Sequence, residues 1–171
     1  MKKFLVAIDQ GTTSSRAVLF SLSGKPIYTS QKEFTQFFPK DGWVEHNPNE
    51  IWNTIKKVLK DVILQSKKLK GKILTIGITN QRETTILWDK KTGKHVYNAI
   101  VWQDRRTEKY CKKIKKKENL IRKKTGLFID PYFSATKIKW ILENVPRAKN
   151  LLKKKQLLFG TIDSFLIWKL T

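Results

Sequence analysis

A short polar stretch near the amino terminus, DQGTTSSR (9–16), lies between two apolar runs. Its glycine, Gly11, lets the backbone approach a ligand closely, because a residue without a Cβ leaves room at a turn. The amides and hydroxyls of Thr12, Thr13, Ser14 and Ser15 can donate hydrogen bonds to phosphate oxygens. The stretch is therefore either an ordinary turn between two strands or a hairpin that binds phosphate.

Two charged residues flank this turn. Arg16 carries a permanent, planar positive charge that suits phosphate. Asp9 ends the first apolar run, where it can hold the Mg²⁺ that accompanies a nucleotide, usually through bound waters. The sequence contains neither a GxxxxGK[ST] loop nor a GxGxxG loop. A phosphate site here would therefore be formed by a β-hairpin and not by the amino terminus of a helix.

A second polar cluster, NQRE (80–83), follows the apolar run KILTIGIT (72–79). Such a β-branched run predicts a buried central strand, and ligands of open α/β sheets bind beyond the carboxyl ends of strands. At that position Arg82 can donate two hydrogen bonds to adjacent hydroxyls, and Glu83 can accept one. Without a family context, however, Arg82 with Glu83 is more often a surface ion pair.

The composition limits the classes of protein to which the chain can belong. The chain has 171 residues, the length of one domain, and its single cysteine, Cys111, permits no internal disulfide. His46 and His95 are far apart in the sequence, so a zinc site is not expected. No apolar run approaches the roughly 20 residues that a membrane span needs. We therefore expect a cytoplasmic protein without a membrane span.

The net charge of +22, from 36 basic and 14 acidic residues, would ordinarily indicate binding to nucleic acid or to an anionic membrane. Most of the basic residues are lysines, and they cluster on the polar sides of expected helices, as in YCKKIKKKENLIRKK (110–124). Lysine is strongly hydrated and lacks the planar group that reads bases and phosphates. We interpret the lysine runs as solvated helix faces, with no specific nucleic-acid partner.

Turn signals and apolar patterns predict the strands. They are expected at 4–8, 16–20, 26–34, 72–79 and 156–160, and on both sides of a turn at Gly93. Three meander strands followed by alternating helix and strand are typical of a mixed sheet with helices packed against it. We predict an α/β fold, a mixed five-stranded sheet with flanking helices, formed by residues 1–171 as one domain.

The longest expected helix follows Asn47, which can cap it, with Pro48 in the first turn and Glu50 reaching back as a capping-box acid. Four further helices are expected. The first begins near Asp104, and the second ends near Gly126. The third extends from a cap at Ser134 to a stop at Pro146, and the fourth lies at 161–171.

The stretch AIDQGTTSSRAV (7–18) resembles the first phosphate motif of the actin, hexokinase and sugar-kinase superfamily. Its particular residues resemble those of the glycerol kinases within the FGGY family of carbohydrate kinases. Five further stretches are similar to the same family, in the same order. They are GWVEHNP (42–48), GITNQRETTILWD (77–89), NAIVWQDRRT (98–107), TGLFIDPYFSATKIKWILENV (125–145) and LLFGTIDSFLIWKLT (157–171). The resemblance extends over the whole chain and implies a ribonuclease H-like domain.

The resemblance implies transfer of the terminal phosphoryl group of ATP to a primary hydroxyl of glycerol, with Mg²⁺ as the metal ion. It assigns Arg82 and Glu83 to the glycerol hydroxyls, Trp102 to the apolar wall of the pocket and Tyr132 to a further hydroxyl contact. It assigns Thr12, Thr13, Ser14 and Arg16 to the nucleotide phosphates, and Thr12 also to the substrate. It assigns Asp9 to the metal ion. Without the family, Trp102 and Tyr132 are more often core aromatics.

Neighbouring polar residues are assigned to structure and not to ligands. Asp104, Arg105 and Arg106 are expected to start the next helix, with the arginines paired to nearby acids. The loop that presents Tyr132 is expected to be shaped by Asp130 and Pro131. Asp163 is expected to lie in the first turn of the last helix, where the helix dipole favours an acidic side chain.

In this superfamily the nucleotide lies between two domains, and the glycerol kinase base comes from a later segment without a counterpart in residues 1–171. We therefore expect an amino-terminal kinase domain that lacks the second domain, carries no certain catalytic residue and is weakly active or inactive alone. The full-length family implies a homo-oligomer. Three alternatives remain open: a cationic binding module that has lost catalysis, an unstable remnant, and a kinase of another small polyol.

Overall fold

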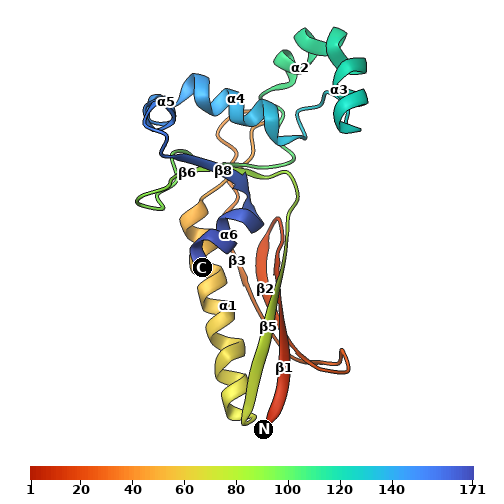
Figure 1. Ribbon diagram of the computed structural model, residues 1–171, viewed down its shortest axis with the longest axis vertical. Helices are drawn as coiled ribbons and strands as arrows, with labels where there is room; N and C mark the ends of the chain where they lie inside the picture. The colour runs from red at the N-terminus through yellow and green to blue at the C-terminus, as the bar shows by residue number, and fades with distance from the viewer. The chain divides into compact units, whose positions relative to one another are not determined.

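The computed structural model describes residues 1–171. Contacts divide the chain into two compact units (Figure 1). The first unit comprises Met1–Gln36 and Asn47–Gln81, and the second unit comprises Phe37–His46 and Arg82–Thr171. No helix in either unit combines the length and the apolar character that crossing a membrane requires.

The first unit is a four-stranded mixed sheet in the order β3-β2-β1-β5. Its strands are β1 (Lys2–Gln10), β2 (Ser14–Ser21), β3 (Pro26–Glu33) and β5 (Gly71–Asn80). The first three strands form the predicted antiparallel meander, and β5 pairs with β1 in parallel. The mixed sheet is therefore confirmed, and the parallel pair brings the carboxyl ends of β1 and β5 together.

One helix, α1 (Pro48–Lys68), covers this sheet and runs along its strands in Figure 1. It begins as predicted, because the Asn47 side chain accepts a hydrogen bond from the Asn49 backbone N–H at 2.9 Å. The capping-box role of Glu50 is wrong. Its Oε1 atom instead accepts hydrogen bonds from the backbone N–H and the hydroxyl of Thr35, both at 3.0 Å.

The strand β5 corrects two further expectations. It lies at the edge of the sheet and not at its centre, and much of it is exposed, with Leu74 at 48% and Ile76 at 43% of full exposure. The predicted five-stranded sheet is also wrong, because the other predicted strands pair with one another in the second unit. A run of β-branched residues indicates a strand but does not show how many neighbours pair with it.

The second unit contains an antiparallel sheet in the order β4-β7-β6-β8. Its strands are β4 (Glu45–His46), β6 (Thr85–Asp89), β7 (Ala99–Ile100) and β8 (Leu157–Thr161). Its helices are α2 (Glu108–Ile114), the 3₁₀ helix η1 (Lys115–Lys117), α3 (Glu118–Thr125), α4 (Ser134–Asn144), α5 (Pro146–Lys153) and α6 (Ile162–Leu170). The lysines of α2, η1 and α3 are exposed, as expected of solvated helix faces.

Proline 146 both ends and begins a helix. The preceding residue, Val145, is extended, with φ −115° and ψ 101°, which stops α4 as predicted. The first residue of α5, a helix that the sequence pattern did not indicate, is Pro146 itself, whose missing N–H costs nothing at that position.

The two-residue strand β4 contains a fully buried histidine, His46, whose burial lowers its pKa from 6.5 to about 4. Between these pH values the unfolded chain binds a proton that the folded chain excludes, so the free energy of unfolding falls as the pH falls. We expect His46 to lower the free energy of unfolding by about 3 kcal/mol between pH 7 and pH 4. Denaturant unfolding across this range should show that the free energy of unfolding depends less steeply on pH in His46→Gln than in the unaltered protein. Equal pH dependence in the two proteins would contradict this role of His46.

Candidate active site

The polar stretch 9–16 forms the hairpin between β1 and β2. The backbone N–H of Gly11 donates to the Ser14 carbonyl at 2.9 Å, and Gln10 pairs with Ser15 across the two strands. This register places Thr12 and Thr13 at the tip of the turn, where Thr13 is exposed. Ser15 does not face a ligand as expected, because it is buried with its Oγ atom 2.8 Å from Thr54 Oγ1.

Two buried glutamines hold the base of this turn. The Gln81 backbone N–H donates to the Gln10 carbonyl at 2.7 Å, and the Gln81 Nε2 atom donates to Gln10 Oε1 at 3.0 Å. Both side-chain amides also donate to the Gly11 carbonyl, at 2.8 Å from Gln10 and 3.0 Å from Gln81. This glutamine clamp, Gln10 with Gln81, joins the carboxyl ends of β1 and β5 and fixes the first peptide of the turn.

The next two carbonyls of the turn are also engaged. Thr12 accepts a hydrogen bond from Gln36 Nε2 at 2.9 Å, and Thr13 accepts one from the Phe34 backbone N–H at 3.3 Å. In a trans peptide the N–H of the following residue points opposite to the carbonyl. Each N–H group of residues 12–14 therefore points away from the donor that holds the carbonyl of its own peptide.

If the turn binds nucleotide phosphates, as the sequence analysis expects, Gln81→Leu should weaken that binding about tenfold, because the Gly11 carbonyl loses an uncharged donor and the turn loses its fixed orientation. Fluorescent ADP displacement on the protein would measure the change. Gln65→Leu, in the partly buried last turn of α1, is the matched control and should bind as the unaltered protein does. Equal affinity of the Gln81 variant would show that the clamp does not orient the turn.

The two charged residues beside the turn pair with each other. Asp9 and Arg16 are opposite one another in the β1/β2 register, and Arg16 Nη2 lies 2.5 Å from Asp9 Oδ2. Both side chains remain partly exposed, at 38% for Asp9 and 47% for Arg16. A single accessible carboxylate fits Mg²⁺, which proteins usually hold by one or two carboxylates together with waters and substrate phosphates. No group of three or more metal-ligating side chains occurs elsewhere in the chain.

The other predicted residues lie in the second unit, whose longer segment begins at Arg82. Arg82 is exposed and forms no ion pair with Glu83, so the surface-pair alternative does not describe this structure. Glu83 has a left-handed backbone with φ 61°, a conformation that costs free energy and often occurs at functional sites. The Glu83 Oε2 atom accepts hydrogen bonds from the backbone N–H of Ser134 at 3.0 Å and from the Ser134 hydroxyl at 2.9 Å.

Glu83 thereby caps the amino terminus of α4. The expected cap, Ser134, is the first residue of that helix and not its cap, and Phe133 in the cap position has no suitable side chain. A carboxylate at a helix amino terminus is favoured by the unpaired N–H groups and by the helix dipole. The glutamate side chain is consequently fixed in position by a helix distant from it in the sequence.

Trp102 and Tyr132 are brought together as an edge-to-face pair, with ring centroids 6.1 Å apart and an interplanar angle of 67°. Both side chains are half-buried, so neither is a core aromatic. The Trp102 backbone N–H donates to Thr84 Oγ1 at 3.2 Å, which ties it to the residue after Glu83. The Tyr132 backbone N–H donates to Asp130 Oδ1 at 2.7 Å, as expected of an aspartate that shapes the loop.

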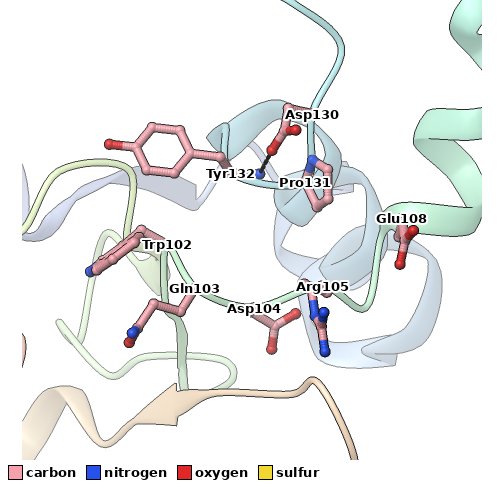
Figure 2. Close-up of a pocket in the computed structure, with 8 residues that line it drawn as sticks. All are labelled: Trp102, Gln103, Asp104, Arg105, Glu108, Asp130, Pro131 and Tyr132. Carbon is pink, nitrogen blue, oxygen red and sulfur yellow. Dashed lines mark hydrogen bonds between the residues drawn. The ribbon is translucent and has the colours of Figure 1, made fainter.

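These two aromatics line one pocket of about 350 Å³. Figure 2 shows both rings on the same side of it. The other lining residues come from the segment before α2, the first residue of α2 and the loop before α4: Gln103, Asp104, Arg105, Glu108, Asp130 and Pro131. Arg82 and Glu83 are not among the lining residues. A cavity of this size, with aromatic walls and polar groups at its rim, can hold a small polar molecule.

Behind the pocket, Arg106 is paired with acids as the sequence predicted. Its guanidinium donates to Asp104 Oδ2 and to Glu45 Oε1, both at 2.8 Å, and all three side chains are buried. Asp104 does not cap α2. Its carboxylate instead accepts from the Val44 backbone N–H at 2.7 Å and from the Arg106 backbone N–H at 2.9 Å. This cluster joins residues 43–45 to the segment that carries Trp102.

The fold and the two sets of residues define the chain as a sugar-kinase domain of the actin/hexokinase-like fold. Its structure superimposes on a crystal structure of Plasmodium falciparum glycerol kinase with ADP, with a TM-score of 0.91 and 36% identity over 98% of this chain and 34% of that one. The chain belongs to the FGGY family of carbohydrate kinases, whose N-terminal domain model matches residues 4–171. The resemblance inferred from the sequence motifs is thereby confirmed.

Curated relatives agree with this assignment. The chain is 56% identical to a glycerol kinase of Streptococcus agalactiae over 172 residues, covering 99% of this chain and 34% of the relative. It is also 56% identical to a glycerol kinase of Bacillus subtilis over 173 residues, covering 100% of this chain and 35% of the relative. The chain thus spans about a third of the length of the relatives that it matches.

Proposed function

We propose that residues 1–171 supply the polyol site and the phosphate turn of a kinase that transfers a phosphoryl group from ATP to glycerol. The observation that carries this proposal is the accessible side chain of Arg82, next in sequence to Glu83 with its fixed carboxylate, in a unit that also contains the Trp102–Tyr132 pair. A site that binds a polyol, with its adjacent hydroxyls and short CH backbone, needs both paired polar groups and an apolar wall. The names of the relatives support glycerol as the polyol.

In this proposal Arg82 donates to two neighbouring hydroxyls and Glu83 accepts from one of them, which fixes the orientation of the triol. Trp102 excludes water from its CH face, and Tyr132 contributes its hydroxyl. A substrate that lacks one hydroxyl leaves a charged group unpaired and loses affinity. The site therefore selects for hydroxyl number and spacing and not for overall size.

The amides of residues 12–14, with the hydroxyls of Thr12, Thr13 and Ser14, are proposed to donate to the nucleotide phosphates. The ADP in the Plasmodium relative supports a nucleotide partner. Asp9 is the residue that would hold Mg²⁺, which would supply neutralisation of phosphate charge, and Arg16, the ion-pair partner of Asp9, is proposed to face the phosphates. Phosphoryl transfer depends mainly on positioning and charge neutralisation, which are the contributions of this chain.

We further propose that turnover requires groups beyond residues 1–171, because the glycerol kinases that the chain resembles are about three times as long as the part that it matches. Isothermal titration of the protein with glycerol, erythritol and xylulose tests the substrate, and a coupled assay of ADP release tests turnover. Glycerol should bind most tightly of the three. Preference for xylulose would assign the site to another polyol, and salt-sensitive binding of DNA without a response to glycerol would favour the cationic binding module.

A further inference from the structure

Lys137, in the first turns of α4, is fully buried. Lysine is almost never fully buried unless its ammonium group is paired. Here the Nζ atom donates to two backbone carbonyls, that of Tyr132 at 2.6 Å and that of Glu83 at 3.1 Å. A single ammonium group thus connects the turn of residues 82–84 with the loop that carries Tyr132.

The Glu83 carbonyl is held by more than one donor. Besides Lys137, it accepts hydrogen bonds from Thr85 Oγ1 at 3.1 Å and Ser134 Oγ at 3.3 Å. The residue has φ 61°, a backbone conformation that persists only where the surroundings determine it. Lys137 is the only charged member of these three donors, and charge-assisted hydrogen bonds are about twice as strong as neutral ones.

We propose that Lys137 is a positioning residue of the polyol site, which holds the Arg82–Glu83 turn and the Tyr132 loop in the relative arrangement that binds substrate. This inference rests on the proposed function of Arg82, Glu83 and Tyr132. Lys137 does not line the pocket, so it acts through the two backbones and does not contact the substrate.

The cost of burying Lys137 supports a specific role. Burial lowers its pKa from 10.5 to about 8, while the charges of Asp104, Glu83 and Asp130 favour its protonated form and that of Arg106 opposes it. A methionine of similar length would fill the same space without this cost. What a methionine cannot supply is a donor for the two carbonyls, which would be left buried without this partner.

The test compares Lys137→Met with two variants on the same helix. Lys139→Met removes a partly exposed lysine that pairs with Glu143, and Ile141→Ala destabilises the core of the second unit at a site outside the polyol pocket. Glycerol affinity is measured by titration well below the melting temperature of each variant. Hydrogen exchange is measured in parallel for peptides covering residues 82–85 and 130–136.

We expect Lys137→Met to weaken glycerol binding by about tenfold or more and to accelerate exchange in both peptides. Lys139→Met should change neither quantity. Ile141→Ala should lower the melting temperature without weakening glycerol binding, which separates positioning from general destabilisation. Unchanged glycerol affinity in Lys137→Met, or an equal loss in Ile141→Ala, would overturn the proposal.

The exchange measurement keeps this inference distinct from the proposed function. If the unaltered protein does not bind glycerol, the proposed substrate is wrong, while faster exchange of both peptides in Lys137→Met still shows that Lys137 orders the two segments. If glycerol binds and exchange in the variant is unchanged, Lys137 does not hold them and the positioning role is excluded.

Discussion

Arg106→Met is expected to lower the free energy of unfolding by about 3–5 kcal/mol. The Arg106 side chain is fully buried and pairs with Glu45 and Asp104, whose side chains are 4% and 0% exposed. Removing the guanidinium leaves two carboxylates in the interior without a counter-charge. The guanidinium also stacks on Trp43 at 3.8 Å and on Trp140 at 4.6 Å from the ring centroids, so its packing is lost as well.

Urea denaturation followed by tryptophan fluorescence would measure this effect, because two tryptophans contact the guanidinium. Arg105→Met is the matched control, since Arg105 is adjacent and exposed, and should change the free energy of unfolding by less than about 0.5 kcal/mol. The triple variant Arg106→Met, Glu45→Gln, Asp104→Asn should recover part of the loss, because the uncompensated charges are gone. Equal stability of the two single variants would show that the buried cluster is not a major source of stability.

Arg82→Ala is expected to weaken glycerol binding about a hundredfold, since it removes the two proposed charge-assisted hydrogen bonds to glycerol, worth on the order of 1.5–3 kcal/mol each, part of which water replaces. The same change should alter the stability by less than about 0.5 kcal/mol, because Arg82 is exposed and has no partner. Calorimetric titration and thermal unfolding of the same preparation separate the two effects.

Arg82→Lys should recover little of the affinity, because an ammonium group cannot donate to two adjacent hydroxyls in the fixed geometry of a guanidinium. Arg147→Ala, an exposed arginine at the start of α5, controls for the general loss of positive charge. Glycerol binding that survives Arg82→Ala but not Arg147→Ala would refute the assignment of the clamp.

Local signals in the sequence were sufficient for most elements of the fold. The Asn47 cap, Pro48 and the apolar residues at helical spacing predicted α1, and the polar turns predicted the first three strands. The pairing of strands was not predictable in the same way. The run 72–79 has the composition of a central strand, but its position at the edge of the sheet depends on which other segments pair, and no local pattern records that choice.

The candidate site shows the same division. Residues with a chemical signature, such as Arg82, Glu83 and the threonines of the turn, were named from the sequence, and their roles stay predictions. Residues that act on backbone carbonyls were missed, namely Gln10, Gln36, Gln81 and Lys137. An isolated glutamine or lysine resembles a surface residue, and its burial becomes apparent only when distant segments pack around it.

In the proposed site the polyol lies against Trp102 with its hydroxyls on Arg82 and Glu83. Nuclear Overhauser effects between isotope-labelled glycerol and assigned side chains of the protein test this placement. We expect contacts from the glycerol protons to the Trp102 ring, and their loss in Arg82→Ala. Contacts confined to other side chains, or contacts with Trp102 that persist unchanged in Arg82→Ala, would contradict it.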